Sequence, residues 1–526
     1  MGSFPGFQKE TRVSPSRPAA VVVLAAGAGT RMRSATPKVL HAMGGRALLG
    51  HAMTAARAVD PERLAVVVRH ERERVAAYVA EADPSAVLVD QDDVPGTGRA
   101  VQCALQRLDA EAATDGALVV MAGDTPLLDG ETLAALVEAH AGSGNAITVL
   151  TAHVDKPFGY GRILREGEQV VGIVEERDAT DAQRAITEIN TSTYVFDAAV
   201  LREFLGGLGA DNDQGEVYLT DVVAAAHGRG LPVRALTVDD PWTVEGVNDR
   251  VQLAALGAKL NDRILARWMR AGVTIVDPGT TWIDVDVELA PDVTIRPGTQ
   301  VHGNTVVGQG AEIGPETTLI DCEVGEGARI VRAHAELAQV LPGGSVGPFA
   351  YLRPGTVVGE RAKVGTFVEV KNSTLGTGSK VPHLSYVGDA DIGAGTNIGA
   401  ASVFVNYDGV NKHRSTVGEN ARTGADNLFV APVTVGDGAY TGAGTVLRHD
   451  VPAGALALND FGQKIIDGWV EKKRPGTPAA KSAAAARGAT GEERPATGDE
   501  AGPSANDPGG AGTDGTETSV SEGSRR

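Results

Sequence analysis

The amino-acid sequence predicts two folded parts in one chain: an α/β domain with a Rossmann-like, mostly parallel sheet, followed by a parallel β-helix. Apolar runs that alternate with helical patterns indicate the first part, over residues 19–250. A six-residue repeat of an aliphatic residue and glycine indicates the second, over residues 272–474. The composition agrees, because 67 of the 526 residues are glycine, against a usual share of about 7%.

The strands of the α/β domain are predicted from short runs that are apolar throughout. Such runs are typical of strands buried on both faces of a parallel sheet, and helical patterns lie between them. The runs are Ala20–Leu24, Leu64–Val68, Ala86–Val89 and Ala117–Met121. Residues 251–271 follow with apolar side chains at helical spacing, from Leu253 and Leu256 to Trp268. We expect them to form a single linker helix.

The β-helix is predicted from aliphatic positions that recur every six residues. The inward positions are Ile295, Val301, Val307, Ile313 and Leu319, then Val346, Leu352, Val358, Val364 and Val370, and finally Val417, Thr423, Phe429, Val435, Thr441 and Leu447. Glycine often follows directly, as at Gly365 and Gly424, where we expect a corner of the coil. Aromatic side chains are expected not to fit so narrow an interior, which would explain why the chain has only 10 Phe, 8 Tyr and 4 Trp.

The two ends of the chain are predicted to carry no chemistry. Residues 1–18 read as a flexible N-terminus, and residues 475–526, poor in large apolar side chains, as a disordered tail. The first residues lack the basic segment followed by an apolar segment that is typical of a secretory signal. No apolar stretch is long enough to span a membrane. Cys103 and Cys322 are too few for a disulfide framework. The net charge of −19 argues against nucleic acid as the main partner. We therefore expect a cytoplasmic protein that binds neither membrane nor nucleic acid.

A glycine turn after the first strand is the first candidate site. It runs from Leu24 to Met32, and Pro37 and Lys38 follow. The dinucleotide fingerprint would need glycine where Met32 stands, and the Gly-Lys-Ser/Thr of a Walker A loop is absent. What remains is a loop of small residues whose backbone N–H groups can approach phosphates, with Arg31 and Lys38 as cations. Taken alone, this pattern fits a purely structural turn equally well.

Further motifs in the same order resemble the sugar-phosphate nucleotidyltransferases. They are Leu24-Ala25-Ala26-Gly27-x-Gly29-Thr30-Arg31-Met32, Gln91, Gly96-Thr97-Gly98, Gly123-Asp124-x-Pro126-Leu127, Gly159-Tyr160-Gly161-Arg162, Glu175, Glu188-Ile189-Asn190-Thr191 and Glu245-Gly246-Val247-Asn248. Together with the β-helix, they make residues 20–474 similar to the bacterial family of bifunctional N-acetylglucosamine-1-phosphate uridylyltransferases/glucosamine-1-phosphate N-acetyltransferases.

The resemblance implies the fold, the assembly and two transferase activities. It implies a left-handed β-helix, a homotrimer formed through it, and acetyl sites shared between subunits. The β-helix would acetylate glucosamine-1-phosphate from acetyl-CoA. The α/β domain would then transfer uridylyl from UTP with Mg²⁺, releasing pyrophosphate and giving UDP-N-acetylglucosamine, a precursor of peptidoglycan in the cell wall.

The resemblance also implies the residues of the uridylyl site. Asp124 and Asn248 would hold Mg²⁺ as hard oxygen ligands. Arg31 and Lys38 would act in catalysis by balancing charge on the phosphates. The residues implied in binding UTP and UDP-N-acetylglucosamine are Leu24, Ala25, Ala26, Gly27, Lys38, Gln91, Gly96, Thr97, Ala122, Gly123, Asp124, Gly161, Glu175, Asn190 and Asn248. Among these, Gln91 and Thr97 would read the uracil edge.

Polar residues interrupt the six-residue repeat and predict a second site. The interruptions are Lys371-Asn372, Pro382–Tyr386 and the insertion Asn406–Lys412. N-acetylation needs a base to deprotonate the sugar amine. Histidine is the side chain that ordinarily exchanges a proton near neutral pH, which makes His383 the natural candidate. By resemblance, glucosamine-1-phosphate would bind to Arg353, Lys371, Tyr386 and Asn397, and acetyl-CoA to Ala400, Asn406, Tyr407, Ala425 and Ala443. Asn406 is also a candidate donor to the tetrahedral oxyanion.

Two departures from the family pattern concern the acetyl site. Ala425 stands where members commonly have serine, so one hydrogen bond at that site is in doubt. Leu458–Gln463 stands where many members have a pair of residues for coenzyme A, which leaves the phosphate contact there open. The alternative function is that of a sugar-1-phosphate nucleotidyltransferase whose β-helix serves only for assembly.

Overall fold

The computed structural model describes residues 17–209, 212, 214–459 and 462–490. The predictions for residues 1–16 and 491–526 lie outside these residues. By its contacts the chain divides into two compact units, of which the first ends at Asn459. In the described part of the chain, no helix is long and apolar enough to cross a membrane.

The α/β domain is built on a mixed, mostly parallel sheet in which β1 lies centrally between β4 and β6. Its path is β11-β7-β10-β6-β1-β4-β5, and β10 runs antiparallel to β6 and β7. The strands are β1 (Ala20–Leu24), β4 (Arg63–Val68), β5 (Val87–Asp90), β6 (Ala117–Ala122), β7 (Ile147–His153), β8 (Arg162–Glu166), β9 (Gln169–Val174), β10 (Glu188–Asp197) and β11 (Val233–Val238), with the hairpin β2 (Ala42–Met43) and β3 (Arg46–Ala47). Its α-helices are α1 (Leu48–Ala58), α2 (Arg72–Ala82), α3 (Thr97–Asp109), α4 (Gly130–Ser143), α5 (Asp181–Arg184), α6 (Ala198–Leu205) and α7 (Asp221–Gly228).

Both faces of this sheet are buried, as the unbroken apolar runs predict. Val21 and Val23 face one core, while Val22 lies in the other. The carboxyl ends of β1 and β6 therefore emerge side by side from a fully packed sheet, which is where α/β folds bind ligands.

A long helix, α8 (Arg250–Arg270), leads into the β-helix. Asp249 caps its start by accepting hydrogen bonds from the backbone N–H groups of Val251 and Gln252. In the middle of the helix, the buried side chain of Asn261 donates to the carbonyl of Thr281 and accepts from the N–H of Ile283. This amide ties the helix to the first coil.

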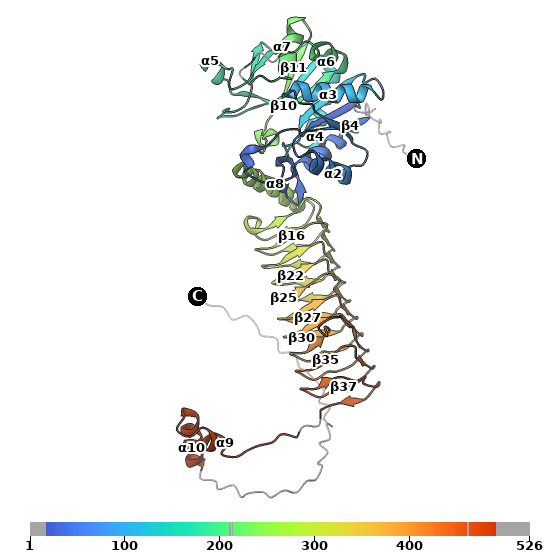
Figure 1. Ribbon diagram of the computed structural model, residues 1–526, viewed down its shortest axis with the longest axis vertical. Coiled ribbons are helices and arrows are strands. Elements are labelled where there is room, and N and C mark those ends of the chain that lie inside the picture. The colour runs from blue at the N-terminus through green and yellow to red at the C-terminus, as the bar shows by residue number, and fades with distance from the viewer. Residues whose placement is uncertain (1–16, 210–211, 213, 460–461, 491–526) are drawn as a thin grey trace, which may run out of the picture. The chain divides into compact units, whose positions relative to one another are not determined.

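The described strands of the second domain fall mainly into three parallel sheets, which form the sides of a β-helix whose coils are stacked as Figure 1 shows. The first sheet holds β12 (Thr274–Ile275), β15 (Thr294–Ile295), β18 (Glu312–Ile313), β21 (Arg329–Ile330), β24 (Ser345–Val346), β27 (Lys363–Thr366) and β30 (Lys380–His383). The second holds β13 (Trp282–Ile283), β16 (Gln300–His302), β19 (Thr318–Ile320), β22 (Ala333–Glu336), β25 (Ala350–Leu352), β28 (Glu369–Lys371), β31 (Tyr386–Gly388), β33 (Val403–Val405), β35 (Leu428–Val430) and β38 (Val446–Leu447). The third holds β14 (Glu288–Leu289), β17 (Val306–Val307), β20 (Glu323–Val324), β23 (Gln339–Val340), β26 (Val357–Val358), β29 (Thr374–Leu375), β32 (Ala390–Ile392), β34 (Ser415–Val417) and β36 (Thr434–Val435), and β37 (Tyr440–Thr441) pairs with β39 (Leu456–Ala457).

The glycines beside the inward residues lie where a side chain would collide with the next coil. A Cβ on Gly365 would approach the carbonyl oxygen of Pro382 to 1.9 Å, and one on Gly424 would approach the backbone nitrogen of Ala443 to 2.5 Å. Close stacking of the coils therefore demands glycine at these positions.

The interior does admit aromatic rings, contrary to the sequence prediction. Phe404 and Phe429 are both fully buried, and their rings stack with centroids 4.2 Å apart and planes 6° from parallel. They occupy equivalent places on β33 and β35. Neighbouring strands lie about 4.8 Å apart, close to the separation of stacked rings, so two flat rings on successive coils fit where a single ring would leave voids.

The second unit contains α9 (Trp469–Lys473) and α10 (Pro478–Thr490). Arg487 donates to Glu471 at 2.9 Å and so joins the two helices. Composition predicts disorder from residue 475, whereas the structure has a helix over Pro478–Thr490. The reason is the alanine-rich run Ala483–Ala486, since alanine has the highest helix propensity.

Candidate active sites

The glycine turn lies at the carboxyl edge of the central strands. Leu24 pairs with Ala122 across β1 and β6, and the N–H of Gly123 donates to the carbonyl of Leu24 at 2.9 Å. The N–H of Ala25 donates to Val67 at the end of β4. Residues far apart in the sequence thus meet at one edge, as the parallel sheet predicts.

Gly29 allows Lys38 to approach the turn. Its φ is +60°, and a Cβ there would lie 2.5 Å from the Cβ of Lys38. Gly27 has no such neighbour, since a Cβ on it would meet nothing within 4 Å. Gly29 is therefore required for packing, whereas Gly27 borders open space into which a ligand can come close to the backbone.

Two cations and two oxygen ligands lie together beyond this turn. The ammonium of Lys38 forms an ion pair with the carboxylate of Asp124, and Arg31 donates to the side-chain oxygen of Asn248 at 2.8 Å. The N–H of Val247 donates to the carbonyl of Asp124 at 2.9 Å, which brings residue 248 beside residue 124. The Lys38 and Asp124 side chains are only 13% and 19% exposed, so their attraction is weakly screened.

The donor set of this cluster suits a magnesium ion. Asp124 offers a carboxylate and Asn248 an amide oxygen, and Mg²⁺ is usually held by one or two such ligands together with substrate phosphates. In the described residues, no group of three or more His, Cys, Asp and Glu side chains is arranged to hold a metal.

A cavity of about 190 Å³ brings several predicted binding residues together. Leu24, Thr97, Glu175 and Asn190 line it. The N–H of Asn190 donates to the carbonyl of Gly161 at 2.9 Å, so the predicted sugar residues lie against one another.

Glu175 is an acid of this cavity whose pKa is raised. Burial raises the pKa of its carboxyl, and the nearby carboxylates of Asp178 and Asp221 raise it further. Burial also raises the pKa of the Tyr194 hydroxyl, which lies on the cavity wall. A carboxyl in such surroundings can accept a hydrogen bond from a sugar hydroxyl when charged and donate one when neutral.

The Gly96–Thr97 segment rests on a part of the chain that the sequence analysis missed. A Cβ on Gly96 would lie 2.2 Å from the carbonyl oxygen of Val217. The N–H of Leu219 donates to the Thr97 hydroxyl at 3.1 Å. The amide nitrogen of Gln91 donates to the carbonyls of Val94 and Gly96, at 2.9 and 3.2 Å. The cavity wall is completed by Gln214, Glu216, Tyr218, Leu219 and Thr220, and the polar side chains among them were the available signal.

On the β-helix, the predicted sugar-phosphate residues lie on successive coils of one side. Tyr351, Glu369 and Tyr386 are in register on β25, β28 and β31. Arg353 lies just beyond β25, and its guanidinium donates to Glu369 at 2.9 Å. Lys371 ends β28. The parallel register therefore brings Arg353, Lys371 and Tyr386 to the same side.

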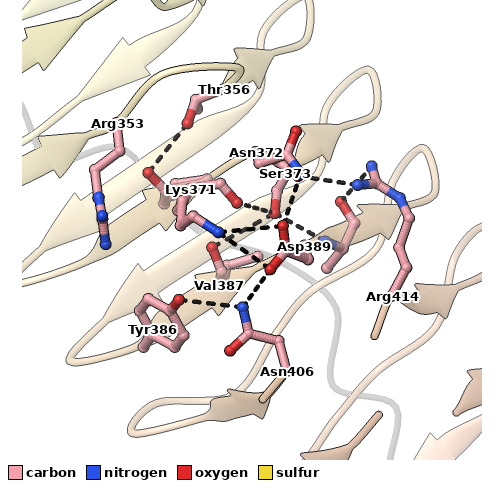
Figure 2. A network of polar contacts seen from close by, with 12 residues as sticks. Arg353, Thr356, Lys371, Asn372, Ser373, Tyr386, Val387, Asp389, Asn406 and Arg414 are labelled. Carbon is pink, nitrogen blue, oxygen red and sulfur yellow. Dashed lines mark hydrogen bonds and ion pairs between the residues drawn. The ribbon is translucent and has the colours of Figure 1, made fainter. Parts of the chain in front are cut away.

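Asp389 is the centre of the polar network in Figure 2. Its carboxylate accepts from Lys371 at 3.2 and 3.3 Å and from Asn372 at 2.7 Å. It also accepts from the side-chain amide of Asn406, which in turn donates to the Tyr386 hydroxyl at 3.3 Å. The sequence analysis missed Asp389, although it follows the polar run that interrupts the repeat.

His383 and three predicted coenzyme A residues follow one corner of the β-helix. The N–H of Ala401 donates to the carbonyl of His383, and that of Asp426 donates to Ala400. On the next coil, the N–H of Gly444 donates to Ala425. His383, Ala425 and Ala443 are exposed on this corner.

Two further predicted residues are neighbours of these groups in the sequence, Asn397 just before Ala400 and Tyr407 directly after Asn406. Asn397 forms backbone bridges with Lys380 and Arg422. Tyr407, 55% exposed, donates its hydroxyl to the carbonyl of Gly409 within the insertion.

Comparison with known proteins identifies the family. The model of the MobA-like NTP transferase domain matches residues 21–188. A protein named "Bifunctional protein GlmU" from Kineococcus radiotolerans is 62% identical over 469 residues, which cover 89% of this chain and 95% of that protein. Proteins of the same name from Pseudarthrobacter chlorophenolicus and Streptomyces avermitilis are 59% and 56% identical, and the matched residues cover 96% and 100% of their lengths. The chain belongs to the family of bifunctional GlmU proteins.

Proposed function

We propose that the chain makes UDP-N-acetylglucosamine by two transfer reactions at separate sites. The β-helix transfers acetyl from acetyl-CoA to the amine of glucosamine-1-phosphate. The α/β domain then transfers uridylyl from UTP to the product and releases pyrophosphate. The observation that carries the proposal is the 62% identity to a bifunctional relative over 95% of its length. A β-helix used only for assembly is not favoured, because the match extends through it.

In the uridylyl reaction, a phosphate oxygen of the sugar attacks the α-phosphorus of UTP in line, so the site must hold several negative charges together. Arg31 and Lys38 balance these charges and orient the phosphates. Asp124 and Asn248 hold Mg²⁺, which when bound neutralises charge on the triphosphate. The ion pair of Lys38 with Asp124 supports this assignment, because a cation already occupies the ligand oxygen that the metal needs.

The nucleotide and the sugar extend from this cluster into the neighbouring cavity. The turn from Leu24 to Gly27, with Gln91, Gly96 and Thr97, binds the nucleotide. Gly161, Glu175 and Asn190 bind the N-acetylglucosamine. In support, Leu24, Thr97, Glu175 and Asn190 line one cavity, and Glu175 is a partly buried carboxyl able to bond a sugar hydroxyl.

In the acetyl reaction, His383 removes the proton from the sugar amine as the nitrogen attacks the thioester carbonyl. Arg353 and Lys371 bind the sugar phosphate, and Tyr386 and Asn397 complete the sugar site. Acetyl-CoA lies along Ala400, Asn406, Tyr407, Ala425 and Ala443. The shared corner of His383 with these coils supports the arrangement.

The chain forms a homotrimer through the β-helix, in which a neighbouring subunit covers part of each acetyl site. Large apolar side chains on the corner that carries His383 support this: Phe349, Phe367 and Leu384 are 52%, 58% and 60% exposed. The rings of Phe349 and Phe367 stack at 5.4 Å. Both co-substrates, UTP and acetyl-CoA, are cytoplasmic metabolites, so the enzyme works in the cytoplasm on small molecules.

Separate assays of the two half-reactions test the proposal. Wild-type protein with acetyl-CoA and glucosamine-1-phosphate should release free thiol. His383→Ala should abolish that release and leave pyrophosphate release from UTP intact, whereas Asp124→Ala should do the reverse. Thiol release that survives the loss of His383 would remove it as the base. A wild-type protein that releases pyrophosphate but no thiol would reduce the β-helix to a scaffold.

A further inference from the structure

Asp389 occupies a turn position that does not itself require a carboxylate. It has a φ of +51°, and its N–H donates to Lys371 on the preceding coil. The same corner holds Leu337 and Asn372 on earlier coils, with φ of +46° and +45°. Because leucine and asparagine make the same turn, the backbone conformation does not explain an aspartate here.

The side chain of Asp389 is buried and surrounded by donors. The residue is 6% exposed. Burial alone would raise the pKa of its carboxyl, but the hydrogen bonds from Asn372, Asn406 and Lys371 lower it below its ordinary value. The carboxyl is therefore ionised at neutral pH and accepts hydrogen bonds without donating any.

The carboxylate of Asp389, which can only accept hydrogen bonds, determines which end of the Asn406 side-chain amide faces it. Of the two ends of a side-chain amide, only the nitrogen can face a carboxylate. The two N–H groups of Asn406 point to Asp389 and to the Tyr386 hydroxyl. Figure 2 shows the amide nitrogen turned toward Asp389 and the oxygen turned away from it. Asn406 therefore presents an acceptor to any ligand beside it, which suits an amine N–H and not an oxyanion.

We propose that Asp389 is a positioning residue of the acetyl-transfer site, which orients the Asn406 amide oxygen toward the substrate amine and holds Lys371 at the sugar phosphate. The proposal rests on the acetyl transfer proposed above. It also reassigns Asn406, expected from the sequence to donate to the oxyanion, as the acceptor that aligns the amine for attack. Asp389 itself touches neither substrate.

The opposing explanation is that Asp389 merely stabilises the corner through an ion pair. Asp391, two residues further on, provides the matched control. Like Asp389 it is paired with a cation, but it lies on β32, and its carboxylate accepts from the guanidinium of Arg414 on the outside of the coil. A purely structural role predicts that any loss of thiol release in Asp389→Asn follows a loss of stability, and Asp391→Asn, whose carboxylate is 47% exposed, controls for removing a charge from this part of the coil. Asparagine suits the first replacement because it tolerates positive φ well.

The decisive experiment is a double-mutant cycle on thiol release. Asp389→Asn should lower kcat/KM about 10- to 100-fold, the range for losing a hydrogen bond to a charged group, while Asp391→Asn should stay within about 2-fold of wild type. If Asp389 acts through Asn406, the double variant with Asn406→Ala should lose little more than the worse single variant. Losses that multiply would overturn the action of Asp389 through Asn406, because the two residues would then act independently. Unchanged pyrophosphate release in each variant would show that the chain is folded.

A crystal structure of Asp389→Asn tests the same proposal without any turnover. We expect the Asn406 amide to turn over or the Lys371 ammonium to move. If both keep their wild-type positions, Asp389 does not position them. The two proposals can therefore fail separately: a wild type that releases no thiol would sink the proposed acetyl transfer, whereas unmoved Asn406 and Lys371 side chains would sink the positioning role.

Discussion

We expect Lys38 to compete with a metal ion for Asp124 when no nucleotide is bound, because the two side chains form an ion pair. Replacing it by methionine keeps most of the side-chain length and removes the charge. Asp124 then loses the cation that occupies one of its oxygens. We expect Lys38→Met to bind a divalent cation more tightly than the wild type and to transfer uridylyl more slowly, because the cation that balances the phosphates is gone.

The size of the effect follows from the burial of the pair. Unit charges about 4 Å apart attract by about 4 kcal/mol at an effective dielectric constant near 20. The lysine regains hydration when the pair opens, and both side chains keep some exposure, 13% and 19%. The net cost of opening is then about 1–2 kcal/mol. Since about 1.4 kcal/mol is tenfold, the variant should bind the cation about 5- to 30-fold more tightly.

Titration with Mn²⁺, followed by electron paramagnetic resonance in the absence of nucleotide, measures this affinity. Mn²⁺ is the appropriate probe because it prefers the same oxygen ligands as Mg²⁺. Asp124→Asn serves as the comparison and should bind the ion more weakly than the wild type. Equal or weaker binding by Lys38→Met would refute the reasoning, because it would mean that the lysine does not hold the ligand oxygen.

Three further predictions concern Glu175, Phe429 and Gly365. Burial and the nearby carboxylates raise the pKa of Glu175, so as pH falls it should take up a proton at a higher pH than an exposed glutamate, and the KM for N-acetylglucosamine-1-phosphate should rise in that pH range. The KM of Glu175→Gln should not rise there. The same rise in wild type and variant would contradict the assignment of Glu175 to the sugar site. Phe429→Ala removes a fully buried stacked ring and should lower the free energy of unfolding by about 3–5 kcal/mol, which a lower urea midpoint would show. Val410→Ala, at a site 83% exposed, should leave the midpoint unchanged. Equal midpoints for Phe429→Ala and the wild type would argue against a stabilising role of the stacked rings. Gly365→Ala places a Cβ 1.9 Å from the carbonyl oxygen of Pro382, next to His383, and should lower both the melting temperature of the β-helix and the rate of thiol release. Gly142→Ala, with open space around its Cβ, should change neither. Wild-type behaviour of Gly365→Ala would show that the coils can move apart without loss of stability.

The sequence predicts local and periodic features well. The inward positions recur every six residues, so Val364 and Val370 could be placed in the core without knowing which coils touch. Gly365 could be assigned to a corner for the same reason. Phe429 falls on the same repeat, but its partner Phe404 could not be placed, because a buried ring is favourable only when the next coil supplies a second ring, and that depends on how many residues separate the coils.

Asp389 shows why part of the site escaped prediction. Its partners come from the coil before and the coil after, at Lys371 and Asn406. Which residues meet depends on coils of unequal length, and the insertion that begins at Asn406 makes the coil after it longer, since Ala390 pairs with Ser415. The helix α10 escaped for another reason, because an averaged composition hides a short alanine-rich run.

Helix α8 belongs to two hydrophobic cores at once. Leu256 packs with Met32 and Met43 of the α/β domain, whereas Ile264 and Leu265 pack into the interior of the β-helix. A fragment that ends before the helix would expose the apolar residues of the first domain that pack on Leu256. A fragment that starts after the helix would expose the apolar interior of the first coil of the β-helix. Both domains therefore need α8 to complete their hydrophobic cores. If the two domains are expressed separately, each piece should need its own copy of this helix to be soluble.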